Sequence, residues 1–207
     1  MILPENHPDA MQVRADMRHW LDAAVIGLNL CPFAKAVVAR GQLHWAVSDA
    51  SDAPALLQDL AEEAQSLLAL PAEQRDTTLL VAPDALPGFL DFLDAVQRAE
   101  RWVRKRGLDG VLQVASFHPA FEFADEAPDA LGHRTNRAPY PTLHLLREDS
   151  IARALESFPD PASIYERNLA TLARLGTAGW DALGLGRSVQ RLAPGPGTPG
   201  ASSREEA

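Results

Sequence analysis

The chain has 207 residues and a net charge of −9, and 46% of its residues are hydrophobic while 23% are charged. This composition is ordinary for a globular domain that buries a substantial core. The negative charge argues against general nucleic-acid binding, which needs a basic surface to neutralise phosphates. No apolar run reaches the ~18 residues of a membrane span, and residues 1–10 lack a secretory signal. We therefore expect a cytoplasmic protein with no membrane partner.

The first part of the chain predicts helices followed by a strand. Apolar residues recur at helical spacing over Met11–Leu30, which predicts one amphipathic helix. Pro32 cannot continue that helix but suits the first turn of another, so we expect a second helix over Pro32–Arg40. The following segments read as a strand over Gln42–Ser48 and a helix over Asp52–Leu70.

The remaining elements alternate in the same way. A short apolar strand is expected over Thr77–Ala82, and a helix begins at Pro83–Asp84 and stops before Gly107. The spacing of its apolar residues predicts a buried face of Phe89, Leu93, Val96, Ala99 and Val103. Further elements are expected as strands over Val111–Phe117 and Thr142–Arg147, helices over Ser150–Ser157 and Pro161–Leu175, and a helical turn over Trp180–Leu183.

This order predicts an α/β sandwich with about four strands. Two consecutive strand–helix–strand units favour parallel pairing, while the last two strands can pair antiparallel across the segment that joins them. We expect a single domain over residues 11–186, preceded by an N-terminal extension, 1–10. The Pro/Gly-rich residues 187–207 are expected to form a disordered tail.

The segment Phe117–Glu148 contains the residues best suited to ligand binding. It holds three of the six histidines, and some twenty residues separate its two apolar runs, whereas ordinary connections have ~4–6 residues. Arginine suits bidentate contact with phosphate or carboxylate. We therefore expect a small anionic ligand, bound by Asn136, Arg137, Tyr140 and Arg147. In the alternative, the arginines pair with nearby carboxylates and only pin the loop.

Three further residues are candidates for catalysis. Cys31 precedes a proline that is expected to start a helix, and the positive end of a helix dipole favours thiolate. The same cysteine continues an apolar stripe, so core packing is the competing interpretation. His118 follows a strand, and His144 lies inside one, flanked by leucines. We expect Cys31 as a nucleophile and His118 or His144 as the group that moves protons.

A non-catalytic interpretation stays open beside the catalytic one. If Cys31, His118 and His144 converge, they form a three-ligand metal or small-ligand site. A third possibility is a scaffold whose long loop has only a structural role. The chain has no Walker loop, GxGxxG, CxxC or GxSxG motif, so no cofactor is indicated and the common nucleotide, redox and serine-hydrolase assignments lose their support.

Three stretches carry a resemblance to a known family. With LNLCPFAK, QVASFHPAFEF and TNRAPYPTLHLLRE, the chain resembles a family of uncharacterised bacterial and plastid proteins, grouped as a domain of unknown function. The resemblance covers roughly Val13 to Trp180. The resemblance implies that Phe117–Glu148 forms one structural unit, and it gives no information about a substrate.

Overall fold

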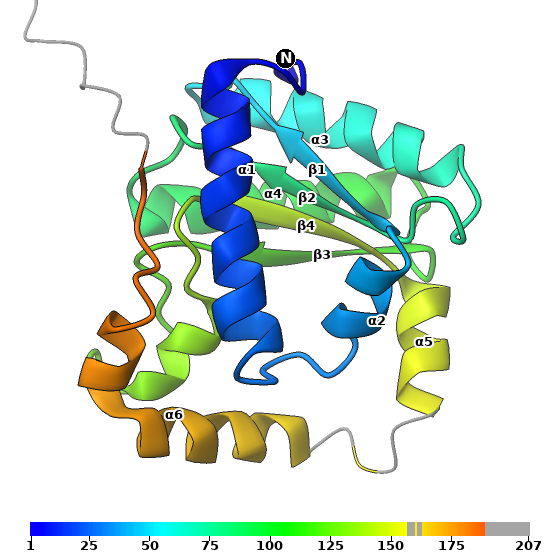
Figure 1. Ribbon diagram of the computed structural model, residues 1–207. Coiled ribbons are helices and arrows are strands. Elements are labelled where there is room, and N and C mark those ends of the chain that lie inside the picture. The colour runs from blue at the N-terminus through cyan, green and yellow to red at the C-terminus, as the bar shows by residue number, and fades with distance from the viewer. Residues whose placement is uncertain (157–159, 161–162, 189–207) are drawn as a thin grey trace, which may run out of the picture.

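Four strands form one mixed sheet in the order β1-β2-β4-β3 (Figure 1). They are β1 (Leu43–Val47), β2 (Thr77–Val81), β3 (Leu112–Phe117) and β4 (Thr142–Arg147). β1 and β2 are parallel, and β4 pairs antiparallel with both β2 and β3. The predicted α/β class and the antiparallel pairing of the last two strands are confirmed. β2 and β3 run in the same direction, but β4 lies between them, so they do not pair with each other.

The computed structural model describes residues 1–156, 160 and 163–188. Its helices are α1 (Pro8–Trp20), α2 (Ala34–Ala39), α3 (Ala53–Leu68), α4 (Phe89–Lys105), α5 (Glu148–Glu156) and α6 (Ser163–Asp181). The helix predicted over Met11–Leu30 begins earlier, at Pro8, and continues beyond Trp20 as a π-helical segment, η1 (Leu21–Ile26). The predicted helix boundaries at Ser157 and Pro161 lie outside the described residues.

Helices α3 and α4 cover one face of the sheet, behind it in Figure 1. Helix α3 begins where the Asp52 carboxylate accepts a hydrogen bond from the amide of Ala55 at 2.9 Å, a standard N-cap. Its apolar stripe and that of α4 pack on alternate strand residues, among them Leu143 and Leu145 of β4. The fully buried side chains of this layer include Leu56, Leu60, Leu67, Leu80, Phe92, Leu112, Leu143 and Leu145.

Helix α1 crosses the opposite face, in front of the sheet in Figure 1. Its residues Val13, Met17 and Trp20 pack against Leu79 and Val81 of β2. The helix covers only part of this face, and shorter segments close the remainder: η1, α2 and α5. The sheet is therefore covered on both sides, as its apolar strands require.

The first ten residues pack on the domain. Leu3 is buried and its amide donates to the carbonyl of Val47 at 2.8 Å. The amino group of Met1 lies 2.7 Å from a carboxylate oxygen of Asp49. At the other end of the described chain, Ser188 donates twice to Asp16. Most of the predicted tail, residues 189–207, lies outside the described residues.

Within the part of the chain that the structure describes, every helix is too short or too polar to cross a membrane.

Two neighbouring residues of α4 test this packing. Phe92 is fully buried, whereas Leu93, which its helical spacing had placed on the buried stripe, is 38% exposed. Phe92→Ala should lower the free energy of unfolding by about 3–5 kcal/mol because it leaves a cavity. Leu93→Ala should cost less than about 1 kcal/mol. Urea denaturation of both variants measures the difference; equal losses would contradict this orientation of α4.

Candidate functional site

His144 lies in the middle of the sheet, on the face that α1 covers only in part. Its neighbours across the strands are Leu79 on β2 and Ala115 on β3. Leu143 and Leu145 on either side point into the opposite core layer, since successive side chains alternate between faces. The arrangement places one imidazole among apolar residues of three strands.

Thr77 fixes the tautomer of His144. The Thr77 hydroxyl donates its one hydrogen to the carbonyl of Leu145 at 2.6 Å. It lies 2.6 Å from Nε2 of His144, so Nε2 must carry the hydrogen and donate it to the Thr77 oxygen. Nδ1 then keeps its lone pair and has no hydrogen-bond partner among the described residues. Burial lowers the pKa of His144 to about 4, so the ring is neutral at pH 7.

A cavity of about 390 Å³ opens on this imidazole, and we call it the inner chamber. Its walls are mostly apolar: Trp20 and Leu21 from the α1–η1 side, Phe117 from β3, and Ile151 from α5. Cys31 also lines the inner chamber. The volume suits a small ligand, since pockets for such molecules are typically ~300–1,000 Å³.

Cys31 reaches the chamber because the chain turns sharply after η1. Asn29 has a φ of 55°, a left-handed conformation that asparagine tolerates better than most residues. The side-chain amide of Asn168 on α6 donates to the carbonyl of Leu30 at 2.9 Å and holds this turn. The following helix begins at Ala34, later than predicted, and has only six residues. Cys31 therefore remains a candidate site residue because it lines the inner chamber, and not because it lies at the N-terminus of a helix.

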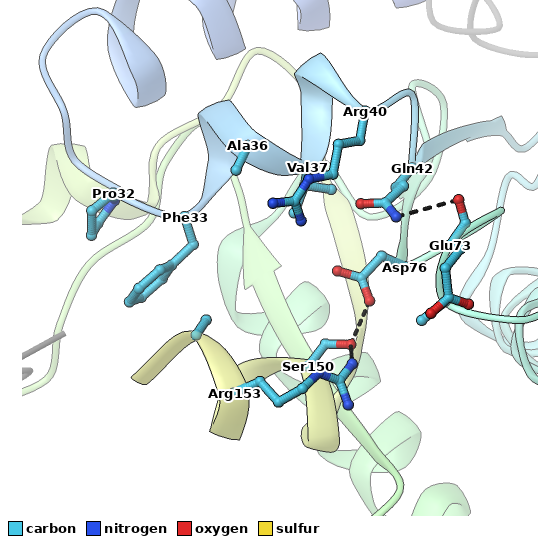
Figure 2. A pocket seen from close by; sticks show the side chains of 12 residues that line it. Pro32, Phe33, Ala36, Val37, Arg40, Gln42, Glu73, Asp76, Ser150 and Arg153 are labelled. Atoms are coloured by element: carbon cyan, nitrogen blue, oxygen red, sulfur yellow. Dashed lines mark hydrogen bonds between the residues drawn. The ribbon is translucent and has the colours of Figure 1, made fainter. Parts of the chain in front are cut away.

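A second cavity of about 820 Å³ adjoins the inner chamber, and we call it the outer chamber. The two cavities share five lining residues, which are Phe33, Val37, Asp76, Ser150 and Ala154. Arg40 reaches toward the outer chamber from the end of α2, and Arg153 lies opposite on α5 (Figure 2). An outer cavity lined by both apolar and charged side chains therefore adjoins an apolar inner cavity that His144 lines.

The polar groups of the outer chamber differ in how they are engaged. Ser150 donates to Asp76 at 2.5 Å and accepts from Arg153 at 2.8 Å. Arg153 also pairs with Asp149 at 2.8 Å. Arg40 has no hydrogen-bond or ion-pair partner for its guanidinium among residues 1–156, 160 and 163–188. Among the described residues that line the outer chamber, Arg40 therefore has the guanidinium that is free to bind a ligand.

Arg147 lines the inner chamber, but carbonyl oxygens hold its guanidinium. Nη2 donates at 2.6 Å to both Leu67 and Leu70 at the end of α3. Nε donates to the carbonyl of Arg75 at 3.3 Å. These bonds satisfy carbonyls that the end of a helix leaves without partners. The predicted anion-binding arginine thus joins β4 to α3 in this structure.

His118 lies away from the inner chamber, where its ring contacts those of Phe89 and Phe92 on α4. Nδ1 accepts from the amide of Ala120 at 3.1 Å, so Nε2 donates to the carbonyl of Leu86 at 3.1 Å. Both ring nitrogens are therefore engaged. Burial lowers the pKa of His118, with a smaller lowering contribution from Arg187 and an opposing one from the Leu86 hydrogen bond.

The other predicted binding residues, Asn136, Arg137 and Tyr140, form hydrogen bonds away from both chambers. The Asn136 amide donates to the carbonyl of Ser116 at 3.1 Å, and Nε of Arg137 donates to that of Phe121 at 3.1 Å. The Tyr140 hydroxyl is fully buried and donates to Asp16 at 2.6 Å. None of these side chains lines either chamber.

The structure therefore brings together Cys31, His144 and Arg147, and it separates His118, Asn136, Arg137 and Tyr140 from them. Among the described residues, no three His, Cys, Asp or Glu side chains are grouped so as to hold a metal ion.

Sequence reasoning missed Thr77, Arg40 and Asn168. Thr77 and His144 are 67 positions apart, and only strand pairing makes them neighbours. Arg40 lies exposed at the end of a predicted helix, where its sequence context does not distinguish it from an ordinary surface cation. Asn168 acts on the backbone next to Cys31 from the far end of the chain, which no local pattern reveals.

Replacement of Arg147 tests its structural role. Arg147→Met removes a charged donor from the carbonyls of Leu67, Leu70 and Arg75, so we expect a loss of about 2–3 kcal/mol in the free energy of unfolding. Arg101→Met, at an exposed position on α4, should change it by less than about 0.5 kcal/mol. Urea denaturation provides the comparison. If Arg147→Met is as stable as the wild type, the structural role is contradicted and Arg147 is again a candidate for ligand binding.

The pH dependence of stability tests the neutral state of His144. Its pKa falls from 6.5 in the unfolded chain to about 4 in the folded chain. The unfolded state therefore binds more protons between these values, and stability is lost as the pH falls through this window. The loss from this group approaches about 3 kcal/mol below pH 4. His144→Gln should remove that part of the decline, while the exposed substitution His19→Gln should retain it, as measured by urea denaturation at several pH values.

Comparison with known proteins supplies the family. A search of curated proteins finds no match, and no solved structure matches the chain. A family model described as "Protein of unknown function (DUF1415)" matches residues 12–182. This range includes η1, the Cys31 turn, the whole sheet and all of α6. The chain belongs to this family of proteins of unknown function.

Proposed function

We propose that the protein is an enzyme that acts on a small anionic molecule bound in the two chambers. The single observation that supports this most directly is the shared inner chamber, which a thiol and a neutral imidazole both line. Cys31 is the proposed nucleophile and His144 the proposed proton acceptor. In cysteine-dependent catalysis, a neighbouring base takes the proton of the thiol so that sulfur can attack.

Thr77 prepares His144 for this role. Because Nε2 donates to the Thr77 hydroxyl, the lone pair is confined to Nδ1. Nδ1 is available at pH 7, since the pKa of His144 is about 4. In the proposed step the Cys31 sulfur forms a bond to an electrophilic carbon of the substrate, the thiol proton moves to Nδ1, and the leaving group departs. Thr77 is a positioning residue in this scheme.

The two chambers indicate what shape of substrate fits. The inner chamber has apolar walls and accommodates a small hydrocarbon or aromatic group near His144. The outer chamber carries the polar groups, and there Arg40 is the proposed partner of a phosphate or carboxylate. This assignment places the anionic group at Arg40 instead of at Arg137 and Arg147.

The remaining parts of the proposal concern partners and location. The net charge of −9 disfavours nucleic acid as the partner. The single thiol suits the cytoplasm, where cysteines stay reduced. A non-catalytic ligand-binding module is the alternative, and it requires a chamber without a reactive thiol.

Alkylation of Cys31 tests the thiol–imidazole pair. Iodoacetamide should label Cys31 in the folded protein at pH 7, and His144→Gln should slow this at least about tenfold because the proton acceptor is lost. Thr77→Val, which preserves the side-chain shape, should give an intermediate rate. His19→Gln serves as the control histidine and should leave the rate unchanged. A Cys31 that stays unlabelled, or a rate that is indifferent to His144, would support the non-catalytic module.

A matched pair of alkylating reagents tests whether the proposed site prefers an anionic substrate. Iodoacetate and iodoacetamide differ mainly in charge. Arg40→Gln should slow labelling of Cys31 by iodoacetate about threefold or more and leave labelling by iodoacetamide unchanged, since only the carboxylate reagent gains from a cation at the mouth. Arg101→Gln is the control for net charge. Equal slowing of both reagents would remove Arg40 from the proposed substrate site.

A further inference from the structure

Three arginines meet in a pocket of about 330 Å³ that is separate from both chambers. They are Arg134 and Arg137, from η2 (Leu131–Asn136) and its end, and Arg187 of the C-terminal segment. We call this cavity the arginine pocket. It shares no lining residue with the inner chamber. Trp20 lies between the two spaces, because its ring lines the inner chamber and its Nε1 donates to the carbonyl of Arg137 at 2.9 Å.

The 3-10 geometry of η2 accounts for the first two arginines. Such a helix has three residues per turn, so side chains three positions apart lie above one another. Arg134 and Arg137 have this spacing. The structure therefore places two like charges close together on one side of η2, an arrangement that costs free energy unless a negative charge offsets it.

The lining of the arginine pocket supplies little negative charge. Asp181 is its carboxylate, against three guanidinium groups. Burial lowers the pKa of Arg134; Asp181 opposes this effect, and Arg137 adds to it. Nη1 of Arg134 is buried and has no hydrogen-bond partner within the described residues. Among the described residues that line the pocket, positive charges therefore exceed negative charges by two.

Each guanidinium is nevertheless held in place. Nε of Arg137 donates to Phe121, and Nη2 of Arg187 donates to Pro83 at 2.6 Å. Arg187 lies over the ring of Tyr140 at 4.7 Å, and Arg134 lies 5.8 Å from the ring centroid of Trp180. Cations held this way lose little side-chain entropy when a ligand arrives, which favours binding.

We infer that the arginine pocket binds the phosphate group of a small molecule. Three guanidinium groups from separate parts of the chain suit a tetrahedral oxyanion better than a planar carboxylate, which a single arginine already satisfies in bidentate fashion. A phosphate dianion would neutralise the excess of two positive charges. The ligand is a small molecule, because the pocket is small and the acidic protein repels a polyanion. This site is independent of the proposed catalytic chambers.

Inorganic phosphate is the probe for the test. At constant ionic strength and pH 7.5, phosphate should raise the melting temperature of the wild type in a saturable way, since a ligand that binds only the folded state stabilises it. Acetate should give a clearly smaller rise. Arg137→Gln and Arg187→Gln should each weaken the apparent affinity at least about tenfold, while Arg101→Gln should leave it unchanged.

A second measurement covers variants that fold poorly. Broadening of the phosphorus NMR signal of phosphate by the protein reports binding directly, and Arg137→Lys and Arg187→Lys retain the charge while losing the planar fork. Broadening that persists unchanged in both lysine variants would overturn the inference. So would a wild type that phosphate does not stabilise, or one that phosphate and acetate stabilise equally. Cys31 alkylation, measured on the same samples, reports on the proposed function separately.

Discussion

The insertion of β4 between β2 and β3 is the constraint on which the rest of the structure depends. β4 pairs with a strand on each side, and, as in any strand, its side chains alternate between the two covered faces. Leu143 and Leu145 enter the core under α3 and α4. His144 necessarily points the other way, into the face that α1 covers incompletely. A strand needed for the core thereby also positions the polar group of the inner chamber.

The polar residues of the long segment between β3 and β4 mainly serve the segment itself. His133 illustrates this: Nδ1 accepts from the amide of Phe123 at 3.1 Å, and Nε2 lies 2.8 Å from the carbonyl of Ala127. His118 and Asn136 likewise bind nearby backbone groups. A segment without regular pairing must satisfy its buried backbone groups with side chains, and this need explains why so many donors occur there. The arginines that remain line a separate pocket.

The inner chamber concentrates groups that are costly to bury. An imidazole and a hydroxyl lie among mostly apolar residues of this sheet face, and the low pKa of His144 reflects the penalty for charging the ring there. An apolar side chain at this position would remove that penalty. Polar groups that a core does not need are characteristic of functional sites, which favours the inner chamber over the long segment as the place of the proposed chemistry.

Local patterns in the sequence determined the element types, because helix and strand periods depend on neighbouring residues. The α/β class, the four strands and the antiparallel final pair were all predictable in this way. Even so, Leu93 shows that the rotation of a helix about its axis is hard to read from spacing alone. Cys31, His144 and Arg147 were identified as candidates from their residue types. Only the tertiary structure decided which candidates meet: pairing across 67 positions joined Thr77 to His144, and the end of α3 engaged Arg147. These contacts depend on strand order and on how helices dock, which are set by packing of the whole chain rather than by any one segment.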